Sequence, residues 1–172
     1  HWERILSAGN ERPPLTLRAN ARAGSRDALV ARLAAQGIEC APVGDAGVIV
    51  ARARPVRDLP GFDEGAFSVQ DAGAQLAAPL LRARDGERVL DACAAPGGKA
   101  AHVLELARVE LTALDSDETR LARVRENLAR LGLAGSGERV VAGDAAAPST
   151  WWDGRAYDRI LADVPCTASG IV

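Results

Sequence analysis

The sequence contains no methionine, only three cysteines and a single lysine, Lys99. Because methionine is missing even at position 1, we expect the chain to begin inside a longer protein. Cys40, Cys93 and Cys166 form an odd set without the spacing of metal ligands. These cysteines argue against a disulfide-stapled fold and against a zinc ribbon, so we predict no metal site and a reducing, cytoplasmic location.

Long apolar runs are missing as well. None approaches the roughly 18 residues that a membrane span requires. No charged segment followed by an apolar one opens the chain, as it would in a secretory signal. Apolar residues nevertheless make up 48% of the 172 residues, which is enough for a core and argues against disorder. We therefore expect one folded domain, or one with a small companion, and no membrane partner.

The net charge of −2 gives no hint of a nucleic-acid partner, but the charge is unevenly distributed. Residues 1–60 contain 9 arginines and 6 acidic residues, whereas residues 61–172 contain 12 basic and 17 acidic residues. An ordinary solvated surface explains so small a basic excess. The alternative is that the front segment contacts RNA phosphates, through the clustered arginines Arg12, Arg18, Arg22 and Arg26.

Prolines and glycines divide the chain into three parts. Pro13 and Pro14 end what resembles the tail of a preceding helix. A connector rich in proline and glycine at residues 54–65 marks a second boundary. The predicted parts are residues 1–12, the end of a helical segment; residues 13–60, a small α+β subdomain; and residues 61–172, a larger domain.

Short periodic segments predict a β-α-β-β arrangement for the small subdomain. Residues 15–19 alternate as a half-buried strand does, and Ser25 is a suitable N-cap for a helix that ends near Gly37. Residues 38–43 and 47–53 then predict two strands around a turn.

From Arg88 onward, strands and helices alternate, which predicts an α/β fold with a parallel sheet and helices on both faces. The expected strands are residues 88–92, 110–114, 139–142 and 158–162, and the expected helices are residues 70–82, 99–107 and 117–131. Ligands bind at the carboxyl ends of such strands. An acidic residue closes each strand, and four of them on one edge predict a site: Asp91, Asp115, Asp144 and Asp163.

The turn after the first of these strands is built from small residues and reads Asp91-Ala-Cys-Ala-Ala-Pro-Gly-Gly-Lys99. Small residues allow a ligand to approach the backbone, and a helix N-terminus offers N–H groups to an anion. The spacing matches neither common nucleotide motif. Asp115 lies 18 residues after Gly97, where a carboxylate can accept both hydroxyls of a ribose. Lys99 indicates a need for a compact ammonium donor, the alternative being a lysine that only faces solvent.

Two strings resemble signature motifs of the S-adenosylmethionine-dependent RNA cytosine-C5 methyltransferases: Cys93-Ala-Ala-Pro-Gly-Gly-Lys99 and Asp163-Val-Pro-Cys-Thr-Ala-Ser-Gly170. Residues 12–20 and Val69-Gln-Asp71 resemble the bacterial 16S rRNA branch of that family, the RsmB/Sun/Fmu type. The resemblance covers nearly the whole chain. It implies a Rossmann-like class I methyltransferase sheet that is incomplete at its C-terminus, S-adenosylmethionine as cofactor and small-subunit ribosomal RNA as substrate.

The resemblance also implies residue roles. The loop would wrap the methionine end of the cofactor, Asp115 would hold the ribose and Asp144 the adenine edge, and Asp163 would face the cofactor amine or the target base. A turn cap is the alternative for Asp144, and Asp91 would orient the loop or contact the ligand. The implied cofactor-binding residues are Cys93, Ala94, Ala95, Pro96, Gly97, Gly98, Lys99, Asp115, Asp144 and Asp163.

Cytosine C5 is a poor nucleophile, and in this family a thiolate adds at C6 to activate it. A Thr-Cys motif supplies that thiolate, and a Pro-Cys cysteine, here Cys166, helps to release the product. No Thr-Cys pair occurs in this sequence, so we expect the nucleophile beyond Val172 and the chain alone to be inactive. Two alternatives remain: a DNA cytosine-C5 methyltransferase, in which the Pro-Cys cysteine attacks, and a non-catalytic RNA-binding or assembly factor.

Overall fold

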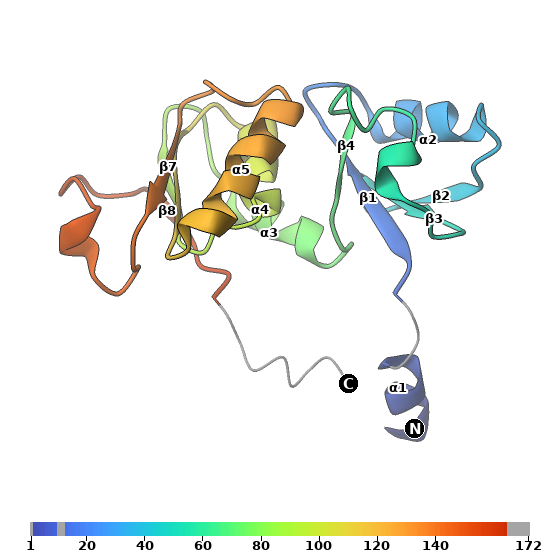
Figure 1. Cartoon of the computed structure of the whole chain (residues 1–172), viewed down its shortest axis with the longest axis horizontal. Helices are drawn as coiled ribbons and strands as arrows, with labels where there is room; N and C mark the ends of the chain where they lie inside the picture. The colour runs from blue at the N-terminus through green and yellow to red at the C-terminus, as the bar shows by residue number, and fades with distance from the viewer. Residues whose placement is uncertain (1, 10–12, 165–172) are drawn as a thin grey trace.

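The computed structural model describes residues 2–9 and 13–164, and it places two sheets side by side (Figure 1). A short helix, α1 (Trp2–Gly9), comes first. The small unit consists of β1 (Leu15–Ala19), α2 (Arg26–Ala34), β2 (Cys40–Val43), β3 (Gly47–Val50), the 3₁₀ turn η1 (Val56–Asp58) and β4 (Phe67–Val69). Its four strands form an antiparallel sheet in the order β2-β3-β1-β4.

The larger unit contains an entirely parallel four-stranded sheet in the order β7-β6-β5-β8. Its elements are η2 (Ala74–Leu76), α3 (Ala77–Leu81), β5 (Arg88–Asp91), α4 (Gly98–Leu106), β6 (Glu110–Asp115), α5 (Glu118–Arg130), β7 (Glu138–Ala142), η3 (Pro148–Thr150) and β8 (Arg159–Leu161). The Rossmann-like α/β fold expected from the sequence is thereby confirmed.

The small sheet is held together by the alternation of β1. Leu17 and Ala19 face a core that they share with Leu29 and Leu33 of α2, which begins after the Ser25 cap as predicted. Fully buried Phe67 lies in the same core, because β4 pairs with β1. β4 is not predicted from the sequence, because three residues are too few to show a periodicity. The small sheet therefore extends past residue 60.

The prediction of a helix at residues 70–82 is wrong for the first half of that range. The Asp71 carboxylate accepts a hydrogen bond of 2.9 Å from the Gly73 amide, and this local bond competes with helix formation. Only η2 and α3 form there, and α3 ends at Arg82 in the left-handed conformation.

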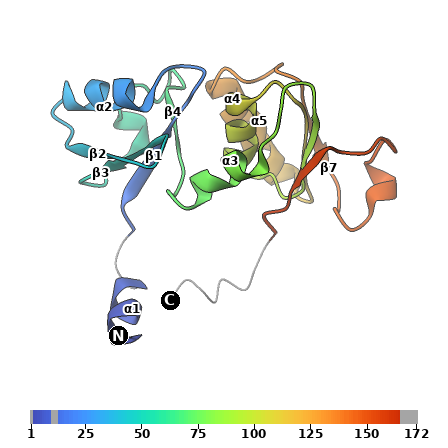
Figure 2. The same cartoon turned by 180° about the vertical axis from the view of Figure 1, so that it is seen from behind.

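The described helices α3, α4 and α5 lie on the face of the parallel sheet that is turned toward the small unit, as both views show (Figure 1, Figure 2). The expectation of helices on both faces is wrong for this part of the chain. Successive crossovers from β5 to β6 to β7 run in one direction, so their common handedness places α4 and α5 on one side. The link to β8 contains only η3, and Trp151 and Tyr157 pack against Leu90 and Leu114 instead.

The long helix α5 follows its sequence pattern closely. The Asp117 side chain caps its N-terminus through the amide of Thr119, at 2.8 Å. Leu121, Val124 and Leu128 are buried in the main core against α4 and the sheet. None of the helices within residues 2–9 and 13–164 is long or apolar enough to cross a membrane.

Candidate functional site

The carboxyl edge of the parallel sheet carries four acidic residues. Asp91 is the last residue of β5, and Asp115 is the last residue of β6. Asp144 lies two residues after the end of β7, and Asp163 lies two residues after the end of β8. The sheet order places the topological switch point between β5 and β8, which is where open α/β sheets bind ligands.

The loop between β5 and α4 needs its small residues. Gly97 has a φ of 100°, and a Cβ at this position would lie 3.2 Å from the Cα and Cγ1 atoms of Val124 on α5. The Ala94 amide donates to the Leu114 carbonyl at 2.9 Å, which fixes the loop on β6. A larger residue at position 97 would therefore push the loop away from the helix that supports it.

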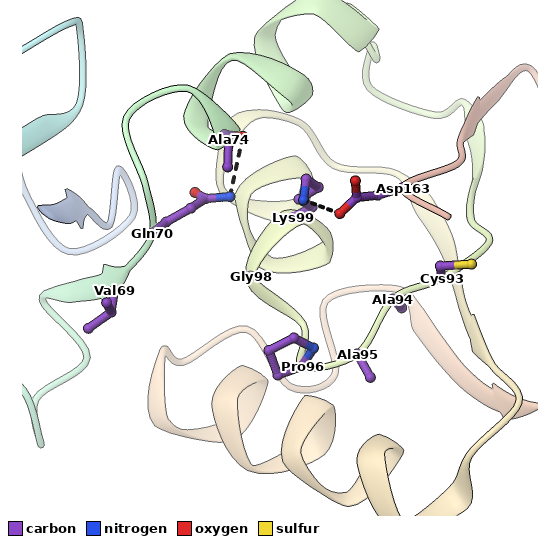
Figure 3. Close-up of a pocket in the computed structure, with 10 residues that line it drawn as sticks. All are labelled: Val69, Gln70, Ala74, Cys93, Ala94, Ala95, Pro96, Gly98, Lys99 and Asp163. Carbon is purple, nitrogen blue, oxygen red and sulfur yellow. Dashed lines mark hydrogen bonds and ion pairs between the residues drawn. The ribbon is translucent and has the colours of Figure 1, made fainter. Parts of the chain in front are cut away.

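Two cavities adjoin at this edge and share Cys93, Ala95 and Asp163. The inner cavity, of about 160 Å³, lies between the loop and the segment that leaves the small sheet (Figure 3). The rim cavity, of about 600 Å³, lies over β6 and β7 and is bordered by Asp115 and Asp144. Volumes of this order suit a ligand of nucleoside size.

Lys99 and Asp163 point toward each other across the inner cavity and form an ion pair (Figure 3). Lys99 thus has a partner and does not simply face solvent. Its ammonium neutralises much of the Asp163 charge, so this carboxylate has less charge to offer a cationic ligand.

Asp115 is buried and already has several partners. Its carboxylate accepts from the Ala95 amide at 3.1 Å, the Asp117 amide at 3.2 Å and Arg120 Nη1 at 3.3 Å. A carboxylate has about four acceptor sites, so a two-hydroxyl contact with a ribose requires Arg120 to release its bond. Arg120 is not among the site residues predicted from the sequence. A basic residue in the first turn of a helix opposes the helix dipole, and this signal could have indicated it.

Asp144 caps a turn, which is the alternative role considered for it, and it also borders the rim cavity. Its carboxylate accepts from the Ala146 amide at 2.8 Å, and its carbonyl accepts from Trp151 Nε1 at 2.7 Å. Trp151 also packs on Gly143, where a Cβ would lie 2.8 Å from the indole Cδ1. The indole therefore holds the loop of Asp144 against the sheet, a support that the sequence did not reveal.

Asp91 is the most unusual of the four acidic residues. It is 1% exposed, and within the described residues neither carboxylate oxygen accepts a hydrogen bond of normal geometry. Burial raises the pKa of Asp91 to about 6, while the Cys93 amide and Lys99 oppose the shift and the carboxylates of Asp163 and Asp115 add to it. A buried acceptor without a partner beneath the loop is what a cationic ligand could stabilise.

Replacing Asp91 by asparagine should stabilise the ligand-free protein at neutral pH. Because the folded protein holds the pKa above its ordinary value of 3.8, the stability contributed by the protonated form is lost as the pH rises through about 6. We expect Asp91→Asn to raise the free energy of unfolding by about 1–3 kcal/mol at pH 7.5 and by much less at pH 4.5.

Urea unfolding at the two pH values measures this effect. The exposed carboxylate of Asp45 supplies the control, and Asp45→Asn should change stability little at either pH. An Asp91→Asn effect of the same size at pH 4.5 and 7.5 would show that the charge is not its cause.

The two cysteines in the described ranges are poor candidates for an attacking thiolate. Burial raises the pKa of Cys93, and the nearby carboxylates of Asp115 and Asp91 raise it further. Burial also raises the pKa of Cys40, which lies in the small unit. A catalytic thiol needs the opposite shift. The expected helper, Cys166, lies outside the described residues.

Fold and site together define a Rossmann-like methyltransferase domain joined to a small α+β unit. Known family models agree with both parts: one described as "16S rRNA methyltransferase RsmB/F" matches residues 78–172, and one for the ferredoxin-like domain of RsmF/B-like methyltransferases matches residues 1–57. The chain belongs to the RsmB/F family of 16S rRNA methyltransferases, as its motifs led us to expect.

Individual relatives support this assignment. The chain is 49% identical to ribosomal RNA small subunit methyltransferase B of Pseudomonas putida and 47% identical to that of Vibrio cholerae, in each case over 99% of its length. It spans 39% of the length of each of these relatives. A crystal structure of a methyltransferase homologue from Pyrococcus horikoshii superposes on 98% of the chain and 55% of its own, with a TM-score of 0.85 and 31% identity.

S-adenosylmethionine is the cofactor of this family, and the described residues fit it. It supplies a methyl group on a positively charged sulfur atom. Asp91, whose oxygens have no hydrogen-bond partner of normal geometry in the described residues, and the exposed Asp144 carboxylate favour a cation, and the small-residue loop allows close approach. The direct contacts of each carboxylate with the cofactor stay a prediction.

Proposed function

We propose that the protein containing this chain methylates C5 of a cytosine in small-subunit ribosomal RNA, in the cytoplasm. One observation carries the proposal. The cofactor loop and Asp163 meet at the switch point of the sheet, and Asp163 opens the Asp-Val-Pro-Cys motif in a member of the RsmB/F family.

The proposed reaction has three steps: addition of a thiolate, methyl transfer and elimination. A cysteine thiolate adds to C6 of the base, and the electron pair of the C5–C6 double bond makes C5 nucleophilic. C5 then takes the methyl group from the sulfonium, as the S–CH3 bond breaks, its electron pair stays on sulfur and a neutral thioether leaves. A base removes the C5 proton, and the electron pair left behind restores the double bond as the C6–S bond breaks and the thiolate departs. We assign the attack to a Thr-Cys cysteine outside this chain and assistance in release to Cys166.

The family resemblance implies roles for the remaining residues, and their positions at the edge support these roles. We assign the loop Cys93–Lys99 to the methionine end of the cofactor and Asp144 to the adenine edge. We assign Asp115 to the ribose, with Arg120 moving aside. Asp163, paired with Lys99, would face the target base.

The small unit is proposed to contact RNA, but not through all of the arginines first considered. Arg18 is fully buried, so its assignment to RNA phosphates is wrong. Arg52, Arg54 and Arg57 have exposed side chains after β3 and are better placed to reach phosphates.

The covalent step is tested with Cys166→Ser in the full-length protein. If Cys166 assists release, the variant should accumulate a covalent protein–RNA complex in the presence of substrate RNA and S-adenosylmethionine. A denaturing gel detects this complex as a slow band. Cys40→Ser, in the small unit, is the matched control and should behave like the parent protein.

Each other outcome contradicts part of the proposal. Loss of both turnover and adduct in Cys166→Ser would make Cys166 the nucleophile, as in DNA enzymes. Unchanged turnover without an adduct would remove it from the reaction. A parent protein that binds RNA but transfers no methyl group would favour a non-catalytic assembly factor.

A further inference from the structure

One face of strand β1 and of the turn after it is polar and points into the larger unit. Strand alternation places Arg18 on the face opposite to Leu17 and Ala19, and Asn20 and Arg22 follow in the turn after β1. Each donates a hydrogen bond to a main-chain carbonyl of the larger unit. The acceptors are Gly98 at 2.8 Å, Leu131 at 3.0 Å and Leu104 at 3.0 Å, respectively.

Arg18 makes the most extensive of these contacts. It is fully buried, and its guanidinium forms a bidentate ion pair with Glu105, with N···O distances of 2.7 and 3.3 Å. It also donates to Gln70 Oε1 and to the Gly98 carbonyl. Because Gly98 begins α4 and Glu105 lies in its last turn, one side chain holds both ends of the helix.

The position of Gly98 connects this contact to the ligand site. Gly98 and Lys99 follow the tight turn at Gly97, and both line the inner cavity together with Gln70. The larger unit anchors the first part of the loop, through Asp115 on the Ala95 amide and Asn127 on the Pro96 carbonyl. Arg18 adds an anchor from the small unit at Gly98, where α4 starts. A part-buried, charge-assisted hydrogen bond on the Gly98 carbonyl fixes this start before the ligand arrives.

We propose that Arg18 is a positioning residue for cofactor binding: from the small unit, it holds the Gly98 carbonyl and thereby orders the loop that binds S-adenosylmethionine. The proposal rests on the assignment of this loop to the cofactor. It gives the small unit a part in cofactor affinity in addition to its proposed RNA contacts.

The competing explanation is that Arg18 only neutralises Glu105. The double variant Arg18→Met/Glu105→Leu separates the two roles, because replacing a buried ion pair by apolar residues of similar size is often neutral or stabilising. The Gly98 carbonyl still loses its donor in this variant. We expect its thermal midpoint to stay near that of the parent, while its Kd for S-adenosylmethionine rises about tenfold.

Calorimetric titration with S-adenosylmethionine and thermal unfolding of the full-length protein measure both properties. Arg22→Met is the matched control, because within the described residues the hydrogen bonds of the Arg22 guanidinium go to the Leu104 carbonyl, near the far end of α4. Its Kd should equal that of the parent. If the double variant does not fold, Arg18→Lys serves instead, since a single ammonium cannot contact Gly98 and Glu105 as the guanidinium does. Its Kd should rise by a similar factor.

The outcomes distinguish this proposal from the proposed function. A parent protein that does not bind S-adenosylmethionine contradicts the cofactor assignment itself. If the parent binds and the double variant, or Arg18→Lys, binds equally well, the positioning role of Arg18 is overturned. An equal loss of affinity in Arg22→Met would also overturn it, because the effect would then belong to the interface as a whole.

Discussion

Replacing Glu105 alone by leucine is expected to lower the free energy of unfolding by about 3–5 kcal/mol. The substitution leaves the Arg18 guanidinium fully buried without its carboxylate partner. The Gly98 carbonyl and Gln70 accept two of its hydrogen bonds but carry no negative charge. An uncompensated buried charge costs far more than the loss of an exposed ion pair.

Chemical denaturation monitored by circular dichroism measures this loss. The control is Glu64→Leu, because Glu64 is exposed and pairs with Arg32 at 3.8 Å. Exposed pairs of this kind contribute about 0–1 kcal/mol. Similar losses of unfolding free energy in the two variants would mean that the buried pair contributes no more to stability than an exposed pair does.

Gly65→Ala should produce the second large effect, a loss of about 2–5 kcal/mol. Gly65 has a φ of +68°, and a Cβ there would lie 2.2 Å from the Arg130 carbonyl oxygen and 2.9 Å from the Leu131 Cα. These atoms belong to the backbone at the end of α5, so no side chain can rotate away. The Gly65 carbonyl also accepts a hydrogen bond from Asn20 at 2.8 Å, so any shift weakens the polar contacts that Asn20 makes just after β1.

Gly44→Ala separates the contact from the backbone strain. Gly44 has a φ of +55°, but a Cβ there meets no atom within 4 Å. Its substitution should therefore cost only the strain of a left-handed residue, about 1 kcal/mol. Thermal unfolding of both variants provides the comparison, and equal shifts would rule out a tight approach of the two units at Gly65.

Most of the larger unit could be predicted because its signals are local. The apolar spacing of Leu121, Val124 and Leu128 predicts α5, and the repeated strand–helix order predicts a parallel sheet with its acidic residues on one edge. Strand β4 could not be predicted, because it exists only through its pairing with β1. The single-sided placement of the helices likewise depends on strand order, which no local pattern encodes.

The partners of the charged side chains were harder to predict than the elements. From the sequence, an arginine on a strand face is predicted to be solvated or to bind RNA. Arg18 instead pairs with Glu105, 87 positions away in the chain. Likewise, the place of Asp115 in the sequence predicts a ribose contact. In the structure its carboxylate already accepts hydrogen bonds from the Ala95 and Asp117 amides and from Arg120. These are long-range contacts or bonds to backbone amides, and residue type alone does not indicate them.

The acceptors used by β1 and by the turn after it affect how freely such units could be exchanged between enzymes. Gly98, Leu104 and Leu131 contribute main-chain carbonyls, which any sequence of the same fold provides. Among the partners in α4, only Glu105 must match by side chain. A chimera that carries the small unit through Val69 onto another methyltransferase domain thus needs only a few matching side chains: a carboxylate in place of Glu105, the amides of Gln70 and Gln75, and the Arg130 guanidinium that donates to the Phe62 and Phe67 carbonyls. With these kept, recombination could combine different RNA-contacting units with one catalytic domain while the cofactor loop keeps its support.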